Sequence, residues 1–492
     1  MKSIKWLLLI VVIGVVSMIW MPAAASSKSQ KANQEENPPP EQTDETQAYK
    51  MYLPFMTTRP ATPPAATPSV NTFGVETWSY NEGENGSNLL NQANFYFIRR
   101  NALIWSDVEP SQGQRNWSAA SVVDVEADLK HAAKVGKKII LIVRSTPGWA
   151  QKASGKACGP IQDEDILAFA NFMADVVKRY SVSPYNVMYY EIGNEPEAPT
   201  AAAKGTETFG CWGDSTDPYY GGRYYARVLK QVYPKMKQAN SNINVMIGGL
   251  LLDCDPVNPP AGKDCTMSKY LEGILVEGGG PYFDTVNFHS YDYYQGGYGN
   301  YSNSNWASAS STTGPTLIAK ARFIRTVLAN YAVTGKQIYA TEVALICKSG
   351  CGDDVHQKTK AYFAAEAYAA GIVEGLNGTV WYHQYNVWEN TGLMDTDDNP
   401  VYDAFYAAKF ASQEIATTQG GKNVSQGAFF IYELYSTAKG RIWVAWSKDG
   451  ATRSLTFSGA LPKAAYNTFG SSLAVKSTMD IGAAPVYLEW GP

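Results

Sequence analysis

The sequence contains no cluster of basic residues and no excess of one charge. Its 492 residues include 41 lysines and arginines against 45 aspartates and glutamates, which gives a formal net charge of −4. Proteins recognise nucleic acids and anionic membrane surfaces through concentrated positive charge. The composition therefore argues against both as partners.

The sequence also lacks an apolar run long enough to cross a membrane. The longest candidate, residues 6–21, has 16 residues, whereas about 20 are needed to span a bilayer. Lys2 and Lys5 precede this run and the small residues 23–25 follow it, which is the pattern of a cleaved secretory signal peptide. We expect a signal peptide over 1–25 and a secreted mature protein with no membrane segment. An uncleaved N-terminal anchor is the alternative.

Cysteine is scarce. No cysteine lies directly after the apolar run, so no lipid attachment is indicated. In the oxidising environment of a secreted protein, the six cysteines are expected to pair. Among the possible pairings we favour three disulfides, which are Cys158–Cys211, Cys254–Cys265 and Cys347–Cys351. Zinc bound by Cys347, Cys351 and His356 is the alternative, but a fourth ligand is not evident. We expect no metal and no cofactor.

Proline-rich stretches such as "NPPPEQ" and "RPATPPAATPS" mark residues 26–70, which show no sustained apolar periodicity. This composition predicts a disordered or polyproline-like linker. From residue 71 onward, short β-rich runs alternate with longer amphipathic segments. That alternation is typical of a parallel sheet wrapped by helices. The expected strands are 71–77, 95–100, 138–144, 187–193, 244–250, 284–291, 337–343 and 379–385. In the expected helix over 165–180, apolar residues recur every three or four positions.

Eight such units over residues 71–412 predict an α/β fold, a (β/α)8 TIM barrel. A doubly wound sheet is the alternative, but the glycine fingerprint of dinucleotide-binding folds is absent after the first strand. After residue 412 the pattern becomes that of β-strands, which predicts a small C-terminal β-sandwich over 413–492. Its expected strands are 428–435, 441–447, 452–457 and 484–490, with "KDG" at 448–450 joining the second and third as a hairpin.

Glutamates are placed where a barrel of this kind would use them. Catalytic groups of TIM barrels lie at the C-terminal ends of the strands. Glu195 ends the fourth expected strand, in "YYEIGNEPEAP", and Glu342 ends the seventh, in "QIYATEVAL". Glycoside cleavage requires two carboxylates on opposite sides of the scissile bond. These two glutamates are therefore the candidate catalytic pair.

Two neighbouring glutamates are expected to have other roles. Glu191 shares strand parity with Glu195 and would face the barrel interior, where an unpaired charge is costly. We therefore expect it to pair with Arg99 or Arg100. Glu197 lies beyond Pro196, in the following loop, and is expected to be solvated.

These motifs resemble those of the retaining glycoside hydrolases of clan A. In that clan, an Asn-Glu pair on strand four carries the acid/base and a glutamate on strand seven is the nucleophile. The resemblance covers roughly residues 71–492 and is greatest for family 39. Further matching segments are "IWSDVEPSQGQRNW" (104–117), "STPGWA" (145–150), "FHSY" (288–291), "VWYHQY" (380–385) and "GLMDTDDNPVYDAFYAAKF" (392–410).

The resemblance implies a carbohydrate substrate and specific roles in a retaining β-glycosidase. Glu342 would be the nucleophile and Glu195 the acid/base. The other expected site residues are Asn194 at the sugar 2-hydroxyl, Tyr291 holding Glu342, His289 on the same wall, Arg100 (or Arg99) keeping Glu342 ionised, and Trp381 and Trp149 stacking on sugar rings. The alternatives are a non-catalytic carbohydrate-binding barrel and a transglycosylase that uses the same residues.

Overall fold

The computed structural model describes residues 71–205, 207, 209–306 and 314–492. The chain divides into two units, residues 1–62 and 63–492, and all described residues belong to the second. The expected signal peptide (1–25) and linker (26–70) lie outside the described residues.

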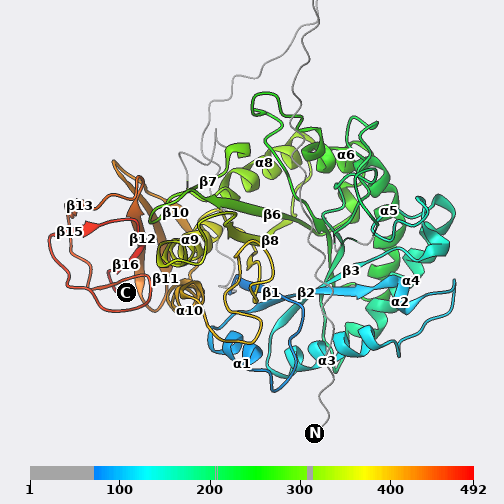
Figure 1. Ribbon diagram of the computed structural model, residues 1–492, viewed down its shortest axis with the longest axis horizontal. Coiled ribbons are helices and arrows are strands. Elements are labelled where there is room, and N and C mark those ends of the chain that lie inside the picture. Colours follow the sequence, from blue (N-terminus) through cyan, green and yellow to red (C-terminus); the bar gives the residue numbers. More distant parts are fainter. Residues whose placement is uncertain (1–70, 206, 208, 307–313) are drawn as a thin grey trace, which may run out of the picture. The chain divides into compact units, whose positions relative to one another are not determined.

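Eight parallel strands form a closed barrel (Figure 1). β1 pairs with both β2 and β9, and β6 pairs with both β5 and β8, so the ring has no open edge. The strands are β1 (Phe73–Thr77), β2 (Phe97–Ile104), β3 (Lys138–Arg144), β4 (Tyr189–Asn194), β5 (Asn244–Gly249), β6 (Thr285–Tyr294), β8 (Gln337–Ile346) and β9 (Gly378–Trp381). The short β7 (Tyr301–Ser302) adds to β6 in antiparallel orientation. All eight barrel strands overlap the predicted segments, so the predicted barrel is confirmed.

Helices surround the ring of strands (Figure 1). They are α1 (Asn85–Gln92), α2 (Trp105–Val108), α3 (Ala120–Lys134), α4 (Ile166–Tyr180), α5 (Gly222–Ala239), α6 (Tyr270–Val276), α8 (Leu317–Asn330), α9 (Asp354–Val373) and α10 (Asp403–Ile415). In α4, the predicted helix, the recurring apolar residues such as Phe169, Met173 and Val177 are buried, whereas Leu167 is exposed. Within the described part of the chain, no helix has the length and apolar character of a membrane span.

The barrel interior is apolar at its base and charged above. Phe97, Ile140, Met246, Tyr339 and Val380 form a buried cluster contributed by five strands. Because side chains two positions apart in a strand face the same side, the next inward positions toward the C-terminal ends include the polar Arg99 of β2 and Thr341 of β8 beside the apolar Ile142 of β3. This change from apolar to polar places the reactive side chains at the C-terminal mouth.

After residue 412 the chain forms two antiparallel sheets. The larger has the order β10-β11-β12-β16-β14, and the smaller pairs β13 with β15. Their bounds are β10 (Gly421–Asn423), β11 (Phe429–Ser436), β12 (Gly440–Ser447), β13 (Arg453–Thr456), β14 (Ala464–Tyr466), β15 (Thr478–Ile481) and β16 (Val486–Glu489). Both sheets contribute to one apolar cluster, which includes Ile431, Leu455 and Leu488.

The hairpin expected between 441–447 and 452–457 is wrong. β12 pairs with β11 and β16, and β13 pairs with β15 instead. The segment after Lys448 therefore leads the chain from one sheet to the other, so that apolar side chains of both sheets reach the shared core.

Three disulfides fasten loops that follow the barrel strands. They join Cys158 to Cys211, Cys254 to Cys265, and Cys347 to Cys351, as the sequence predicted. The zinc alternative is wrong, because the sulfurs of Cys347 and Cys351 are bonded to each other. The Cys158–Cys211 bridge links the loop after β3 to the loop after β4, beside one of the candidate catalytic glutamates.

Candidate active site

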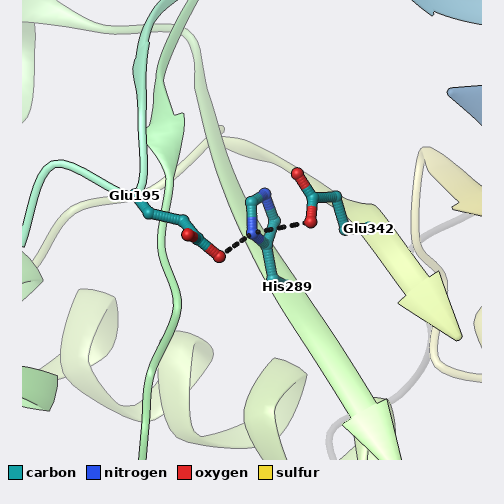
Figure 2. Close-up of side chains that lie close together, drawn as sticks. All are labelled: Glu195, His289 and Glu342. Carbon is teal, nitrogen blue, oxygen red and sulfur yellow. Dashed lines mark hydrogen bonds and ion pairs between the residues drawn. The ribbon is translucent and has the colours of Figure 1, made fainter. Parts of the chain in front are cut away.

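Glu195, His289 and Glu342 converge at the mouth of the barrel from β4, β6 and β8 (Figure 2). The ring Nδ1 of His289 lies 2.8 Å from Oε1 of Glu195 and 3.3 Å from Oε2 of Glu342. One oxygen of each carboxylate and one nitrogen of the ring all lie within 4.8 Å of one another. Residues far apart in the sequence thus form a single cluster.

The spacing of the two carboxylates bears on the stereochemistry of cleavage. Retaining enzymes hold their two carboxyl groups about 5–5.5 Å apart, and inverting enzymes about 6.5–9.5 Å apart to admit a water molecule. Glu195 and Glu342 have oxygens within 4.8 Å of each other. The arrangement therefore fits direct attack by one carboxylate better than attack by an intervening water.

Glu195 occupies a sharp turn directly after β4. Its φ angle of 46° lies in the left-handed region, which costs a non-glycine residue of order 1–3 kcal/mol and is common at active sites. The Glu195 N–H donates to the Gly249 carbonyl across 2.9 Å, which fastens the turn to the end of β5. Burial raises the pKa of Glu195 to about 7, while Arg99 and Lys320 act in the opposite direction.

Gly249 itself permits this close packing. An added Cβ there would lie 2.2 Å from Nε2 of His289 and 3.0 Å from Oε1 of Glu191. The Gly249 N–H also donates to Oε1 of Glu191 across 2.9 Å. Only a residue without a side chain lets β5, Glu191 and His289 approach in this way.

Glu342 is held through both carboxylate oxygens. Nη1 of Arg99 donates to Oε1 across 2.6 Å, and the Tyr291 hydroxyl donates to Oε2. Its side chain is only 5% exposed. These two donors fix the direction of the carboxylate, and the Tyr291 contact is the one that the sequence predicted.

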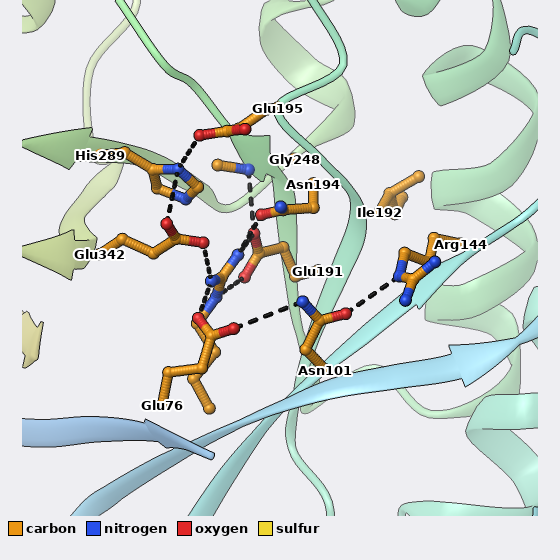
Figure 3. A network of polar contacts seen from close by, with 12 residues as sticks. Glu76, Asn101, Arg144, Glu191, Ile192, Asn194, Glu195, Gly248, His289 and Glu342 are labelled. Carbon is orange, nitrogen blue, oxygen red and sulfur yellow. Dashed lines mark hydrogen bonds and ion pairs between the residues drawn. The ribbon is translucent and has the colours of Figure 1, made fainter. Parts of the chain in front are cut away.

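Arg99 forms ion pairs with Glu76, Glu191 and Glu342. These three glutamates lie together in one buried charge network (Figure 3). Arg99 forms two parallel hydrogen bonds with Glu191, at 2.9 and 2.7 Å, and also binds Glu76 and Glu342. Nη2 additionally donates to Oδ1 of Asn194 across 2.6 Å. The expectation that an arginine neutralises Glu191 is therefore met by Arg99.

Glu76, at the end of β1, is a site residue that the sequence analysis missed. It is fully buried, and burial raises its pKa to about 8, while Arg99 lowers it. Burial and the neighbouring carboxylates thus favour the protonated form of Glu76, whereas its ion pair with Arg99 favours the charged form. Its position at the C-terminal end of the first expected strand is the same signal that identified Glu195 and Glu342.

Arg100 does not reach the site, and its expected role beside Glu342 is wrong. Its side chain pairs with Asp128 of α3, so it lies between the barrel and a helix. Successive residues of a strand face opposite sides, so a change of one residue in register exchanges inside for outside. Arg99, the alternative named from the sequence, occupies the position beside Glu342 that was expected for Arg100.

Glu197 is buried, so the expectation of a solvated side chain is wrong. The chain after Pro196 folds back on itself, with the Trp212 N–H donating to the Pro196 carbonyl across 2.8 Å. Glu197 accepts a hydrogen bond from the Leu252 N–H at 3.2 Å, and burial raises the pKa of Glu197 to about 8. The loop that the sequence presented as exposed is thus packed beneath the mouth.

His289 is fully buried, and burial lowers its pKa to about 4. The imidazole is therefore neutral at neutral pH. Nδ1 lies within hydrogen-bond distance of Glu195, and because the ring is neutral its 3.3 Å approach to Glu342 is not an ion pair. The ring keeps the two carboxylates in a fixed relation without adding charge between them.

The aromatic side chain contributed by β9 differs from the expected one. Trp381 is 1% exposed, its indole N–H donates to the Thr391 carbonyl, and its ring contacts Phe363 of α9. It belongs to the packing outside the barrel, so the expected stacking on sugar is wrong. The next residue, Tyr382, faces the site and lies edge-on to Tyr291.

Trp388 provides a more exposed aromatic surface beside Tyr291 and Tyr382. It is 41% exposed, and its ring centroid lies 5.3 Å from that of Tyr291 and 5.9 Å from that of Tyr382. Trp149, by contrast, is partly buried, donates to the Glu109 carbonyl across 3.0 Å and meets Trp105 edge-on. Its contact with sugar stays a prediction.

Glu195, His289 and Glu342 are also the group, among the described residues, whose donor atoms are close enough to hold a metal ion. A cation there would lie directly on both candidate catalytic carboxylates and compete with their reaction. The paired geometry therefore favours acid–base and nucleophilic chemistry over metal binding.

The family model of cellulases (glycosyl hydrolase family 5) matches residues 64–386, about two thirds of the chain. The chain belongs to glycosyl hydrolase family 5. This family 5 chain is a retaining glycoside hydrolase of clan A, in agreement with the resemblance seen in its motifs. No curated protein matches its sequence.

Solved structures of glycoside hydrolases share the fold of the family 5 chain. A family 39 glycoside hydrolase from Bacteroides cellulosilyticus WH2 is 18% identical with a TM-score of 0.64, over 86% of this chain and 81% of that one. A family 30 endoxylanase from Clostridium papyrosolvens C71 is 13% identical with a TM-score of 0.58, over 87% and 98%. An endo-β1,6-glucanase is 12% identical with a TM-score of 0.58, over 87% and 93%.

Proposed function

We propose that this protein is secreted and hydrolyses β-glycosidic bonds of polysaccharides or oligosaccharides by double displacement. Glu342 is the nucleophile and Glu195 is the acid/base. The observation that carries the proposal is the pair of carboxylates, with oxygens within 4.8 Å of each other at the mouth of the barrel. Their different surroundings support the different roles.

In the first step, a carboxylate oxygen of Glu342 attacks the anomeric carbon of the sugar. The bond from that carbon to the leaving oxygen breaks, and its electron pair stays on the leaving oxygen. Glu195 gives its proton to that oxygen, so the leaving group departs as an alcohol. The products are a glycosyl ester of Glu342 and an ionised Glu195.

In the second step, Glu195 accepts a proton from water, and the water oxygen attacks the anomeric carbon. The ester bond breaks and Glu342 recovers its carboxylate. A carboxyl group with a pKa near 7 suits this exchange, because it both donates and accepts a proton near neutral pH. Two inversions restore the β configuration of the product.

The surrounding residues support this assignment. Arg99 and Tyr291 hold the two oxygens of Glu342. The side-chain oxygen Oδ1 of Asn194 accepts a hydrogen bond from Arg99. The side-chain N–H groups of Asn194 are therefore left to donate to the sugar 2-hydroxyl. Tyr382 and Trp388 offer aromatic faces beside the nucleophile, and we assign sugar stacking to these two residues.

The proposal divides the mature protein into a catalytic barrel over 71–412 and a C-terminal β-sandwich over 413–492, preceded by the linker. Secretion is supported by the three disulfides, which persist in oxidising compartments. The barrel is expected to act on carbohydrate without a cofactor.

The test is a hydrolysis screen with the purified protein. The panel contains chromogenic β-glycosides together with cellulose, xylan and β1,6-glucan. We expect release of reducing ends from at least one substrate, and proton NMR should show the β anomer as the first product. Glu342→Gln and Glu195→Gln serve as matched controls that keep side-chain size. No hydrolysis across the panel, or an α anomer as the first product, would contradict the proposal. Analysis for longer products would reveal transglycosylation.

A further inference from the structure

Arg144, the last residue of β3, lies at the mouth of the barrel. Ile140 belongs to the apolar cluster of the barrel interior, and Arg144 is four positions further along the same strand. Side chains of even spacing share one face of a strand. Arg144 is therefore an inward position above Ile142, near the ring of polar groups that contains Glu76 and Glu191.

The Arg144 guanidinium has no carboxylate partner among the described residues. Its Nε donates to Oδ1 of Asn101 across 3.0 Å, and Nη1 donates to Oγ of Ser145 across 3.2 Å. Both acceptors are neutral. Within the described ranges, Nη2 has no hydrogen-bond partner. By contrast, Arg99 and Arg100, the two arginines of the adjacent strand β2, are both ion-paired.

The charge of Arg144 is retained despite its surroundings. Burial lowers the pKa of Arg144 to about 10, while Glu76 and Asp107 act in the opposite direction. The group therefore stays protonated at neutral pH. A partly buried cation without a charged partner is costly, and such groups are concentrated at functional sites. The Arg144 side chain keeps some solvent-accessible surface, so a ligand can reach it.

A purely structural role accounts for only part of this arrangement. Asn101 donates to Oε1 of Glu76 at 3.3 Å, so Arg144 is linked to the Arg99 network through Asn101 (Figure 3). Holding an amide oxygen requires one neutral N–H donor. It does not require a full charge or the three N–H groups that remain without protein acceptors. These groups point to an anionic ligand.

The charges around the site also bear on the chemical class of ligand that Arg144 binds. Glu191 and Glu342 share Arg99 as their cation, and Glu195 lies beside them in contact with His289. An anionic sugar would be repelled by this cluster unless a second cation received it. The planar fork of a guanidinium matches a carboxylate through two parallel hydrogen bonds.

We propose that Arg144 binds the carboxylate of a uronic acid residue next to the bond that is cleaved. The substrate would then be an acidic, uronic-acid-containing glycan. This inference rests on the proposed function, because it places the ligand in the same cleft as Glu195 and Glu342.

The experiment measures binding of monosaccharides that are not hydrolysed. The dissociation constants of D-glucuronate, D-galacturonate, D-glucose, D-galactose and D-glucose 6-sulfate are determined for the full-length protein by titration calorimetry or ligand-observed NMR. We expect one uronate to bind at least about tenfold more tightly than its neutral counterpart, as is reasonable for a charge-assisted bidentate contact. In Arg144→Gln this preference should fall to within about twofold, and Arg144→Lys should keep part of it.

The control variant is Lys152→Gln, in the loop after β3. It also removes one positive charge, but from an exposed side chain that pairs with Asp163, so it should keep the full preference. Thermal unfolding of each variant checks the fold. Equal binding of uronate and neutral sugar by the wild type would overturn the inference. So would an equal loss of both in Arg144→Gln, which would indicate a structural role, or tighter binding of the sulfated sugar.

The same protein preparations separate this inference from the proposed function. Hydrolysis of neutral β-glycosides without a uronate preference would overturn the inference and leave the proposed function in place. A uronate preference that depends on Arg144, without hydrolysis of any substrate, would support the binding site and contradict the proposed function.

Discussion

Arg99 donates from Nη1 to Oε1 of Glu342 across 2.6 Å, and the guanidinium that makes this bond is fully buried. The same group binds Glu76 and Glu191. One cation therefore orients the candidate nucleophile and offsets the charge of its neighbours. Catalytic geometry and barrel stability depend on the same side chain.

Replacing Arg99 with lysine should separate charge from geometry. A lysine keeps the positive charge but lacks the planar fork that binds Glu191 and Glu342 together. We expect kcat/KM to fall by about 100-fold, the scale of a displacement of about 1 Å at a catalytic group. The matched variant Arg100→Lys alters the pair with Asp128 outside the site, and kcat/KM should change by no more than a few-fold. An equal loss in both variants would contradict the assignment of Arg99.

The two glutamates should respond differently to azide. Glu342→Ala should lose nearly all activity, and azide should restore some of it by attack from the vacated side, which gives an α-glycosyl azide. Glu195→Ala should still form the glycosyl ester when the leaving group needs no proton, and azide should then give a β-glycosyl azide. NMR of the azide products decides the roles. The same anomer from both variants would contradict them.

The pH dependence should reflect the raised pKa of Glu195. The acid must be protonated to donate, and its pKa is about 7, so kcat/KM should fall about tenfold per pH unit above that value. On a substrate with an activated leaving group, Glu195→Ala with azide should lose this alkaline limb. A wild-type profile that stays flat to pH 9 on an unactivated substrate would show that Glu195 is not the acid.

Substitutions of Trp388 and Trp381 should separate an effect on substrate binding from an effect on the stability of the fold. Trp388→Ala removes an exposed ring beside the nucleophile, and KM should rise several-fold, because aromatic contacts contribute about 0.5–1.5 kcal/mol. Trp381→Phe removes the indole donor to Thr391, so the free energy of unfolding should fall by about 1–3 kcal/mol with little change in KM. Steady-state kinetics and thermal unfolding measure both. A larger rise in KM for Trp381→Phe than for Trp388→Ala would reverse the assignment.

The disulfides should contribute according to the length of chain that they close. Cys158 and Cys211 are 53 residues apart, and Cys347 and Cys351 only 4. Replacing the first pair with serine should lower the free energy of unfolding by about 4 kcal/mol, and replacing the second by about 2 kcal/mol. Denaturant unfolding checks the order. A larger loss for the short loop would indicate that native contacts, rather than chain entropy, govern these bridges.

The strands and the candidate catalytic glutamates could be predicted because their signals are local. Buried parallel strands appear as continuous apolar runs, and a glutamate at the end of such a run stands out, as Glu195 and Glu342 do. The disulfide partners were also predictable, because the cysteines occur in pairs within or between neighbouring loops. These features require no knowledge of how distant segments pack.

Two of the errors have a common cause. Arg100 in place of Arg99, and Trp381 in place of Tyr382, are each wrong by one residue, and one residue in a strand exchanges the inner face for the outer face. Glu197 was expected in water because its loop is polar, but the chain after Pro196 folds back and covers it. The hairpin expected after β12 does not form, because the turn sequence does not reveal which sheet the next strand joins.

The sequence by itself determined the barrel, its order of strands and the two glutamates at the strand ends, because hydrophobic periodicity and strand termini are properties of short segments. Only the tertiary structure decided the inward register at Arg99 and Tyr382, the burial of Glu76 and Glu197, and the exposure of Arg144 without a counter-charge. Each of these depends on which strands and loops surround a side chain. Closure of the ring brings side chains of β1, β4 and β8 around the guanidinium of Arg99 on β2. No pattern within a short segment predicts that these side chains come together.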